Sequence, residues 1–213
     1  PTVRPPVFTD KPEEYNVLWR VRKGLFASVG AVRQAGTTVI VEDVAFPGKY
    51  LADASLDLQG LFKKYGYNEA IIFGHTLAGN LHFVFTQNFS IASEMTRYRD
   101  FMEDVVEMVV EKYDGSLKAE HGTGRNMAPI VHKEWGEAAY GLTREINTLF
   151  DPHRILNPGV ILTEDAEVHI KNLKPLLPTH EIVDKCIECG FCEAVCPSKD
   201  LTFTPRQRIA ARR

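Results

Sequence analysis

Cysteine is absent from the first 185 residues of this 213-residue chain, and all four cysteines fall between positions 186 and 196. A secreted domain stabilised by disulfides would spread its cysteines through the core. The clustering therefore predicts a reducing, cytoplasmic compartment and a metal site near the end of the chain.

Long apolar runs and a large excess of either charge are also missing. No stretch reaches the roughly 18–20 apolar residues of a membrane helix, and no basic start followed by an apolar segment indicates a signal peptide. The formal net charge of −3 provides no basic field for nucleic acid, so we expect no such partner. The chain begins with Pro1 rather than methionine, so we expect it to have been cut, processed or renumbered.

The hydrophobic pattern predicts an α+β domain. Helical spacing indicates helices over 17–32, 49–65, 94–113 and 134–149, and β-rich runs indicate strands at 37–46, 70–74, 80–86 and 116–120. Ser93 is placed to cap the third helix. The central order β-α-β-β-α-β is ferredoxin-like, an antiparallel sheet covered by helices on one face.

These patterns divide the chain into four segments. Residues 1–14 form an N-terminal arm, and residues 15–163 form the α+β domain. Residues 164–180 lose the periodicity and form a linker, and residues 181–213 form a truncated ferredoxin-type cysteine module.

The cysteine run has the spacing C-x2-C-x2-C-x3-C-P, with its thiols at Cys186, Cys189, Cys192 and Cys196. This is the run with which bacterial ferredoxins bind a 4Fe–4S cluster. Zinc sites pair two C-x-x-C units across a longer gap, so a zinc-binding regulatory domain is the weaker alternative. The fourth cysteine serves the other cluster in two-cluster ferredoxins. Because no partner run follows, we expect an incomplete cluster site and a parent chain that continues.

A second group of metal-type residues lies in the α+β domain. His75 ends one predicted strand and His82 enters the next, so a hairpin can bring both imidazoles together. Glu120 ends a third predicted strand and can add a carboxylate. Two histidines and one carboxylate suit Zn²⁺, Mn²⁺ or Fe²⁺. Spacing alone leaves a metal site and two unrelated histidines both open.

Three further motifs occur together and in order: Gly74-His75-x4-Asn80-Leu81-His82, Glu120-His121-Gly122-x-Gly124 and Phe150-Asp151-Pro152-x3-Leu156-Asn157-Pro158-Gly159. With them, residues 15–163 resemble the C-terminal substrate domain of FAD-linked 2-hydroxyacid dehydrogenases of the vanillyl-alcohol-oxidase class. That family includes glycolate oxidase subunits, D-lactate dehydrogenases and D-2-hydroxyglutarate dehydrogenases. The cysteine run resembles the iron–sulfur module fused to its large bacterial members.

The resemblance implies a role for several residues. His75, His82 and Glu120 match ligands of a divalent metal, with zinc or manganese as the expected ion. His121 matches the general base that takes the substrate's hydroxyl proton while the C2 hydride leaves for FAD.

Substrate and flavin contacts follow in the same way. Arg22 and Asn80 match substrate-binding positions, with the Arg22 guanidinium suited to a carboxylate. Asn157 matches a position near the flavin. Nothing in the chain resembles the half that holds the FAD pyrophosphate, so we expect that half to precede Pro1 in the parent protein and this chain alone to be inactive.

The leading hypothesis is therefore part of an FAD-dependent 2-hydroxyacid dehydrogenase, with D-2-hydroxyglutarate ranked ahead of D-lactate and glycolate. Electrons would pass from FAD through 4Fe–4S clusters to a quinone or another carrier, which would allow a peripheral location at the inner membrane. The hairpin turn reads Leu77-Ala78-Gly79-Asn80 where many relatives have Gly-Asp-Gly-Asn, and Val41 and Val84 replace lysine and a polar residue of hydroxyglutarate-type members. The lost acid motivates the alternative, an electron-transfer or docking module with a degenerate metal site.

Overall fold

The computed structural model describes residues 7–174 and 176–213, which form two compact units. The cysteine unit combines the N-terminal segment up to Ala35 with Pro178–Arg213, and the sheet unit is Gly36–Leu177. This division differs from the predicted one, because the first helix was expected in the α+β domain and instead groups with the cysteines.

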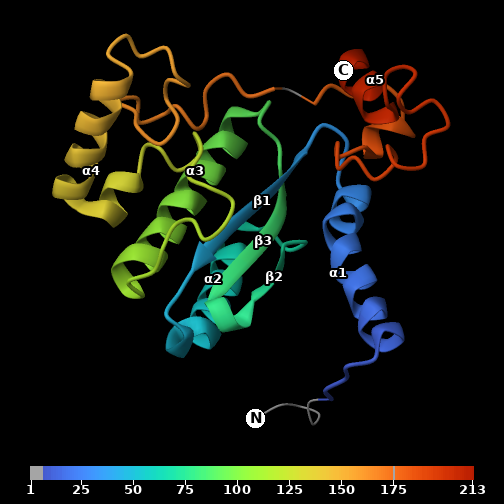
Figure 1. The fold of residues 1–213 in the computed structure, drawn as a ribbon, viewed down its shortest axis with the longest axis horizontal. Helices are drawn as coiled ribbons and strands as arrows, with labels where there is room; N and C mark the ends of the chain where they lie inside the picture. Colours follow the sequence, from blue (N-terminus) through green and yellow to red (C-terminus); the bar gives the residue numbers. More distant parts are fainter. Residues whose placement is uncertain (1–6, 175) are drawn as a thin grey trace. The chain divides into compact units, whose positions relative to one another are not determined.

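The sheet unit contains a three-stranded antiparallel sheet and its helices (Figure 1). The strands lie in the order β1-β3-β2, so β3 is central. This confirms the predicted α+β class with an antiparallel sheet. The elements in chain order are β1 (Thr38–Ala45), η1 (Gly48–Tyr50), α2 (Leu51–Tyr65), β2 (Ile71–His75), η2 (Thr76–Ala78), β3 (Asn80–Gln87), α3 (Ala92–Val106), the π-helical η3 (Glu107–Lys112) and α4 (Val131–Phe150).

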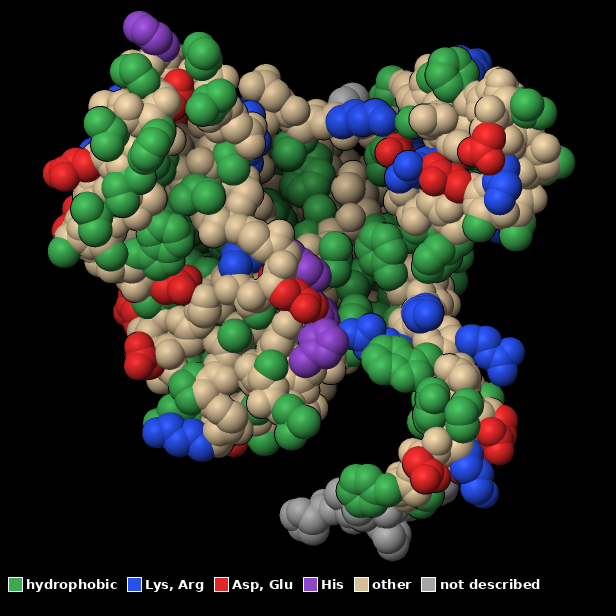
Figure 2. All heavy atoms as spheres, in the orientation of Figure 1, with side chains coloured by type: hydrophobic (Ala, Val, Ile, Leu, Met, Phe, Trp, Pro, Cys, Tyr) green, Lys and Arg blue, Asp and Glu red, His purple; other side chains and the backbone are tan. Residues whose placement is uncertain are grey.

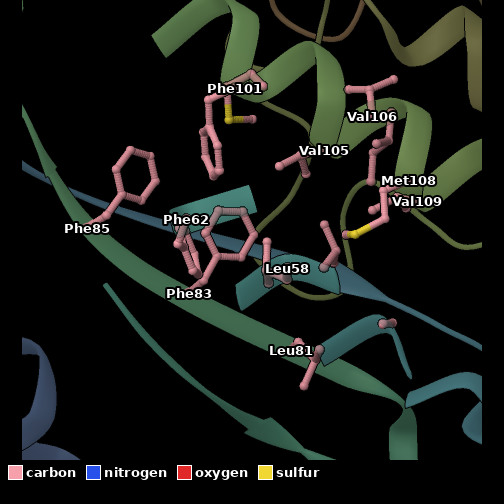
Figure 3. Packing of buried hydrophobic residues seen from close by; sticks show 14 of the residues in the cluster. Leu58, Phe62, Leu81, Phe83, Phe85, Phe101, Val105, Val106, Met108 and Val109 are labelled. Carbon is pink, nitrogen blue, oxygen red and sulfur yellow. The ribbon is translucent and has the colours of Figure 1, made fainter. Parts of the chain in front are cut away.

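The hydrophobic core lies between the sheet and the helices α2 and α3. Side chains alternate along β3, so Phe83 and Phe85 enter this core while His82 faces the opposite side of the sheet. Figure 3 shows the two phenylalanines beside Phe62 of α2 and Phe101 of α3. The rings of Phe62 and Phe101 stack on each other, with their centroids 5.5 Å apart. The aromatic core thus fixes which face of β3 carries its histidine.

The fourth predicted strand, 116–120, is wrong except at its first residue. Ser116 forms one antiparallel bridge with Ala45, and the backbone after it is irregular. The physical reason is a side chain, because the carboxylate of Asp43 accepts the backbone N–H groups of residues 119–121. Those donors therefore bond to a side chain rather than to a strand.

Two helices begin or run differently from the prediction. α3 follows Ile91 as its N-cap residue, so Ser93 lies in the first turn and the predicted cap is wrong. α4 is interrupted at Gly136, which has φ of +73°. Within residues 7–174 and 176–213, no helix is long and apolar enough to cross a membrane.

The cysteine unit contains α1 (Pro12–Val32), η4 (Val183–Lys185) and α5 (Pro205–Arg212). α1 begins inside the predicted arm, and residues 1–6 of that arm lie outside the described residues. A Cβ on Gly30 would lie 2.3 Å from Cγ2 of Ile187, so the Ile187 side chain packs directly against the backbone of α1. Arg33 donates from Nη2 to the carbonyl of Cys186 at 3.0 Å. The end of α1 is therefore anchored to the start of the cysteine run.

The predicted linker also contributes to the fold. Val168 is 7% exposed, and Ile170 packs against the hydrophobic core of the sheet unit. Residue 175 of the linker lies outside the described residues. The first part of this segment is thus packed on the sheet unit rather than free of it.

Candidate metal and substrate site

The three predicted metal ligands meet at one end of the sheet. His75 ends β2, His82 lies on β3, and Glu120 lies in the site loop, which we define as residues 116–121. Nε2 of His75 and Nε2 of His82 lie 3.2 Å and 2.8 Å from Oε1 of Glu120. One ligand atom from each residue lies within 4.8 Å of the others. Figure 2 shows histidine side chains, in purple, beside acidic side chains, in red, on this face of the molecule.

The β2–β3 hairpin produces this geometry. In its register His75 pairs with Asn80 and Phe73 pairs with His82, which puts both imidazoles on one face. Their ring centroids lie 5.3 Å apart. Ala78, which stands where many relatives have the turn acid, is exposed to solvent. The loss of that acid therefore leaves the three ligands together.

His121, the predicted base, lies directly beside these ligands. Its ring stacks on that of His82, with centroids 4.8 Å apart and planes at 18°. Its Nδ1 lies 3.5 Å from Oδ1 of Asp43, and its side chain is 35% exposed. The imidazole thus has one nitrogen near a buried carboxylate and a surface open to a ligand.

The pKa of His82 is lowered, first by burial and then by the neighbouring His121. Both causes disfavour the imidazolium form. The neutral imidazole is the form that can donate a lone pair to a metal ion. The environment of His82 therefore suits a ligand.

Asp43 is the residue of the site that sequence reasoning missed. It lies on β1 directly across from His82 and is 0% exposed. Its Oδ2 accepts the backbone N–H groups of Ala119, Glu120 and His121 at 3.1, 2.6 and 3.2 Å. An acid inside the apolar run Val39–Phe46 was the available signal, because a buried carboxylate needs partners.

Two other carboxylates hold the site loop. Glu134 of α4 accepts from the hydroxyl of Ser116 at 2.7 Å and from the backbone N–H of Leu117 at 2.8 Å. Glu42 of β1 forms an ion pair with Lys118. The loop that carries Glu120 and His121 is thus fixed from both sides.

The remaining predicted site residues lie in three places. Asn80 is buried beside His75 in the hairpin register, and its Oδ1 has no hydrogen-bond partner within the described part of the chain. Arg22 lies on α1 in the cysteine unit, with its guanidinium carbon 5.4 Å from the ring centre of Trp19. Asn157 has φ of +52° and lines a separate pocket of about 310 Å³ near the end of α4. Their roles with substrate and flavin stay predictions.

The four cysteines lie on the loop after η4. Gly190 adopts φ of +82° in this loop, and the thiol of Cys196 lies 3.3 Å from the hydroxyl of Ser198. All four are free thiols, the donor type that iron–sulfur clusters take. Among the described residues, the sets of three or more metal-type ligand atoms within 4.8 Å occur only at the histidine site.

Comparison with known proteins agrees with this arrangement. A family model described as the C-terminal domain of FAD linked oxidases matches residues 2–161, so the chain belongs to that family. A model described as a 4Fe-4S binding domain matches residues 181–201. The recognition of both modules from sequence motifs is confirmed, which favours iron over zinc at the cysteines.

Curated relatives extend the comparison. The chain is 31% identical over 213 residues to a D-2-hydroxyglutarate dehydrogenase of Pantoea ananatis, covering 90% of this chain and 20% of the relative. It is 27% identical over 144 residues to the glycolate oxidase subunit GlcD of Bacillus subtilis, covering 68% and 30%. It is 30% identical over 145 residues to a D-2-hydroxyglutarate dehydrogenase of Escherichia coli, covering 68% and 14%. The chain thus spans less than a third of the length of each of these relatives.

Proposed function

We propose that this chain is the substrate- and metal-binding part of an FAD-dependent 2-hydroxyacid dehydrogenase, joined to the start of its electron-transfer module. The observation that carries the proposal is the convergence of His75, His82 and Glu120 beside His121. The family match and the names of the relatives support it.

The donor set fits a divalent metal. Two imidazole nitrogens and one carboxylate oxygen are ligands for zinc or manganese and leave positions open for a substrate. Burial lowers the pKa of His82 and so disfavours its imidazolium form, and the site loop holds Glu120 in place. Such an ion would hold the substrate's hydroxyl and carboxylate and lower the pKa of the hydroxyl.

His121 is the base in this proposal. An imidazole suits the role because its ordinary pKa lies near working pH. With Nδ1 of its ring toward Asp43, its Nε2 is the atom that takes the hydroxyl proton. A bound FAD would supply the acceptor for the C2 hydride, so that the product would be a 2-oxoacid. Asn80 is the second expected substrate contact, and its position opposite His75 in the same hairpin supports this.

D-2-hydroxyglutarate is the substrate we favour over D-lactate and glycolate, since several relatives carry that name. The contact for its distal carboxylate must differ from that of relatives with lysine in the strand. Val41 and Val84 pair across β1 and β3 on the face of His82, and neither can bind an anion. Arg22 remains the residue that the family resemblance leads us to expect at a substrate carboxylate.

The cysteine module is the proposed route by which electrons leave the flavin. Four thiols at ferredoxin spacing would hold iron–sulfur centres that take electrons one at a time from the flavin, towards a quinone or another carrier. We expect FAD to be held mostly by a further part of the parent protein, and this chain alone to be inactive. The alternative of a degenerate metal site is disfavoured by the 2.8 Å and 3.2 Å approaches of the two histidines to Glu120.

Substrate binding to the zinc-loaded chain tests this function without the flavin. Calorimetric titration with D-2-hydroxyglutarate, D-lactate and glycolate should give saturable binding, strongest for one D-2-hydroxyacid. Glutarate and propionate, which lack the hydroxyl, are the matched ligands and should bind more weakly. Equal binding of hydroxylated and matched acids, or no binding of any of them, would overturn the proposal.

A further inference from the structure

Among the buried polar atoms near the site that have no hydrogen-bond partner within the described part of the chain, two belong to residues paired across strands: Oδ1 of Asp43 and Nδ1 of His82. A buried polar group without a partner is costly and calls for an explanation. The two residues face each other across the β1–β3 pairing. A carboxylate oxygen and a ring nitrogen on neighbouring strands can satisfy one another once the nitrogen carries a proton.

The surroundings of Asp43 leave Oδ1 for this purpose. Oδ2 is already occupied by the three backbone N–H groups of the site loop. Around Oδ1 lie Nδ1 of His121 at 3.5 Å and Nζ of Lys118 at 3.8 Å. A ring nitrogen of His82 also lies within 4.8 Å of the ligand atoms of Asp43 and His121. Nζ of Lys118, which pairs with Glu42, is too far from Oδ1 for a hydrogen bond, so the two imidazoles remain as donors for Oδ1.

The protonation of His82 depends on what its other nitrogen does. Nε2 of His82 lies 2.8 Å from Oε1 of Glu120 and can donate a proton there, in which case Nδ1 carries none. If Nε2 binds a metal ion, its proton must move to Nδ1, beside Asp43. Histidines that bind metals almost always donate their other N–H to a carboxylate, a carbonyl or water.

We propose that Asp43 is the positioning residue of this site: Oδ2 holds Glu120 and His121 through the backbone, and Oδ1 accepts the Nδ1 protons of His121 and of metal-bound His82. The near-parallel stacking of the two rings lets both Nδ1 atoms face one acceptor. One imidazole then presents Nε2 to the metal and the other presents Nε2 to the substrate. The roles given to these two Nε2 atoms rest on the proposed function, whereas the protonation of His121 at Nδ1 requires no metal ion.

The competing explanation is that Asp43 only caps the backbone of the site loop. Asn at this position separates the two roles, because the amide oxygen still accepts backbone N–H groups while the amide nitrogen cannot accept an imidazole proton. Asp151→Asn is the matched control. Asp151 is also buried, and it accepts the backbone N–H groups of Ile155 and Leu156 at 2.9 and 2.8 Å, without contact to the histidines.

The test is two-bond ¹⁵N–¹H correlation spectroscopy of ¹⁵N-histidine-labelled chain, which reports the protonated nitrogen of each ring, together with zinc affinity from competition with a chelator. The wild type should show His121 protonated at Nδ1 with and without zinc, and His82 changing from Nε2–H to Nδ1–H when zinc binds. In Asp43→Asn, His121 should lose its fixed tautomer and zinc affinity should fall about 10- to 100-fold. Asp151→Asn should keep both.

Wild-type tautomers and zinc affinity in Asp43→Asn would overturn the proposal, as would an equal loss in both variants. If Asp43→Asn does not fold, the wild-type spectra decide, because His121 protonated at Nε2 contradicts the proposal directly. These outcomes differ from those expected if the proposed function is wrong. A chain that binds no zinc refutes the metal site, whereas the tautomer of His121 in the metal-free chain still supports or refutes the part assigned to Asp43.

Discussion

Gly74 is a position at which the β2–β3 hairpin has no room for added volume. It pairs with Leu81, and a Cβ built on Gly74 would lie only 2.1 Å from the backbone oxygen of Asn80 and 3.0 Å from Cα of Leu81. Both obstacles are backbone atoms, which cannot rotate away as a long side chain would. Gly74→Ala should therefore separate the two strands that hold His75 and His82.

The expected size of this effect follows from the contact. Real Cβ atoms essentially never approach closer than 3.0 Å, so the oxygen must move by about 1 Å. Added volume in a packed site usually costs about 1–3 kcal/mol, and we expect Gly74→Ala to lower the free energy of unfolding of the sheet unit by that amount. Metal–ligand distances tolerate about 0.2 Å, so zinc affinity should fall as well.

Urea unfolding followed by circular dichroism, and zinc titration of the folded variant, measure the two effects. Gly60→Ala is the matched control, because Gly60 lies inside α2 and a Cβ there meets nothing within 4 Å. That control should raise the free energy of unfolding by about 0.5–1 kcal/mol, as expected for alanine in a helix. A Gly74→Ala variant as stable as the wild type, with unchanged zinc affinity, would refute the hairpin geometry described here.

Three further predictions concern the core, a surface ion pair and the cysteines. Phe101→Ala should lower the free energy of unfolding by about 3–5 kcal/mol in urea titrations, because Phe101 is fully buried among aromatic rings, and a smaller loss would contradict that packing. Hydrogen bonds from Lys112 and Tyr113 hold the pKa of Asp57 below its ordinary value of 3.8. The charged carboxylate of Asp57 therefore stabilises the folded state above pH 3.8, and this stabilisation is lost as the pH falls through the lowered pKa of the folded state. Asp57→Asn should therefore lose less stability than the wild type between pH 5 and pH 3, and equal losses would contradict the assigned cause. Cys189→Ser should lower the iron content of anaerobically reconstituted chain, measured by elemental analysis, and zinc in place of iron in the wild type would argue for the regulatory alternative.

Most of the sheet unit could be predicted because its sequence signals are local. The run Thr38–Ala45 is rich in β-branched residues, and the helical spacing of Leu58 and Phe62 marks the buried face of α2. The irregular backbone of residues 117–120, where a strand was predicted, could not be foreseen, because the carboxylate that accepts its N–H groups comes from Asp43, more than seventy positions earlier in the chain. Side-chain acceptors of this kind leave no pattern in the segment that they hold.

The partnership of α1 was also hidden. Its apolar residues predict a helix, but periodicity does not say which surface a helix covers. The structure groups it with the cysteine segment through Gly30 and Arg33, which contact Ile187 and Cys186. Contacts between residues some 150 positions apart depend on shape and on single hydrogen bonds, which one sequence does not reveal.

The histidine site was predictable in part. The turn between His75 and His82 allowed a hairpin, and the hairpin brings them together. The approach of Glu120 required the site loop, whose course depends on Asp43 and Glu134. The sequence therefore indicated the ligands, whereas the residues that position them became visible only in three dimensions.

The most direct test of the central claim is a calorimetric zinc titration of the chain and of three variants, His75→Ala, His82→Ala and Glu120→Gln. His153→Ala, which removes an exposed histidine outside the site, is the control. We expect one zinc ion per chain at the histidine site in the wild type and in the control, and loss of that ion in each of the three variants. Zinc binding that survives all three substitutions, or a wild type that binds no zinc at this site, would contradict it.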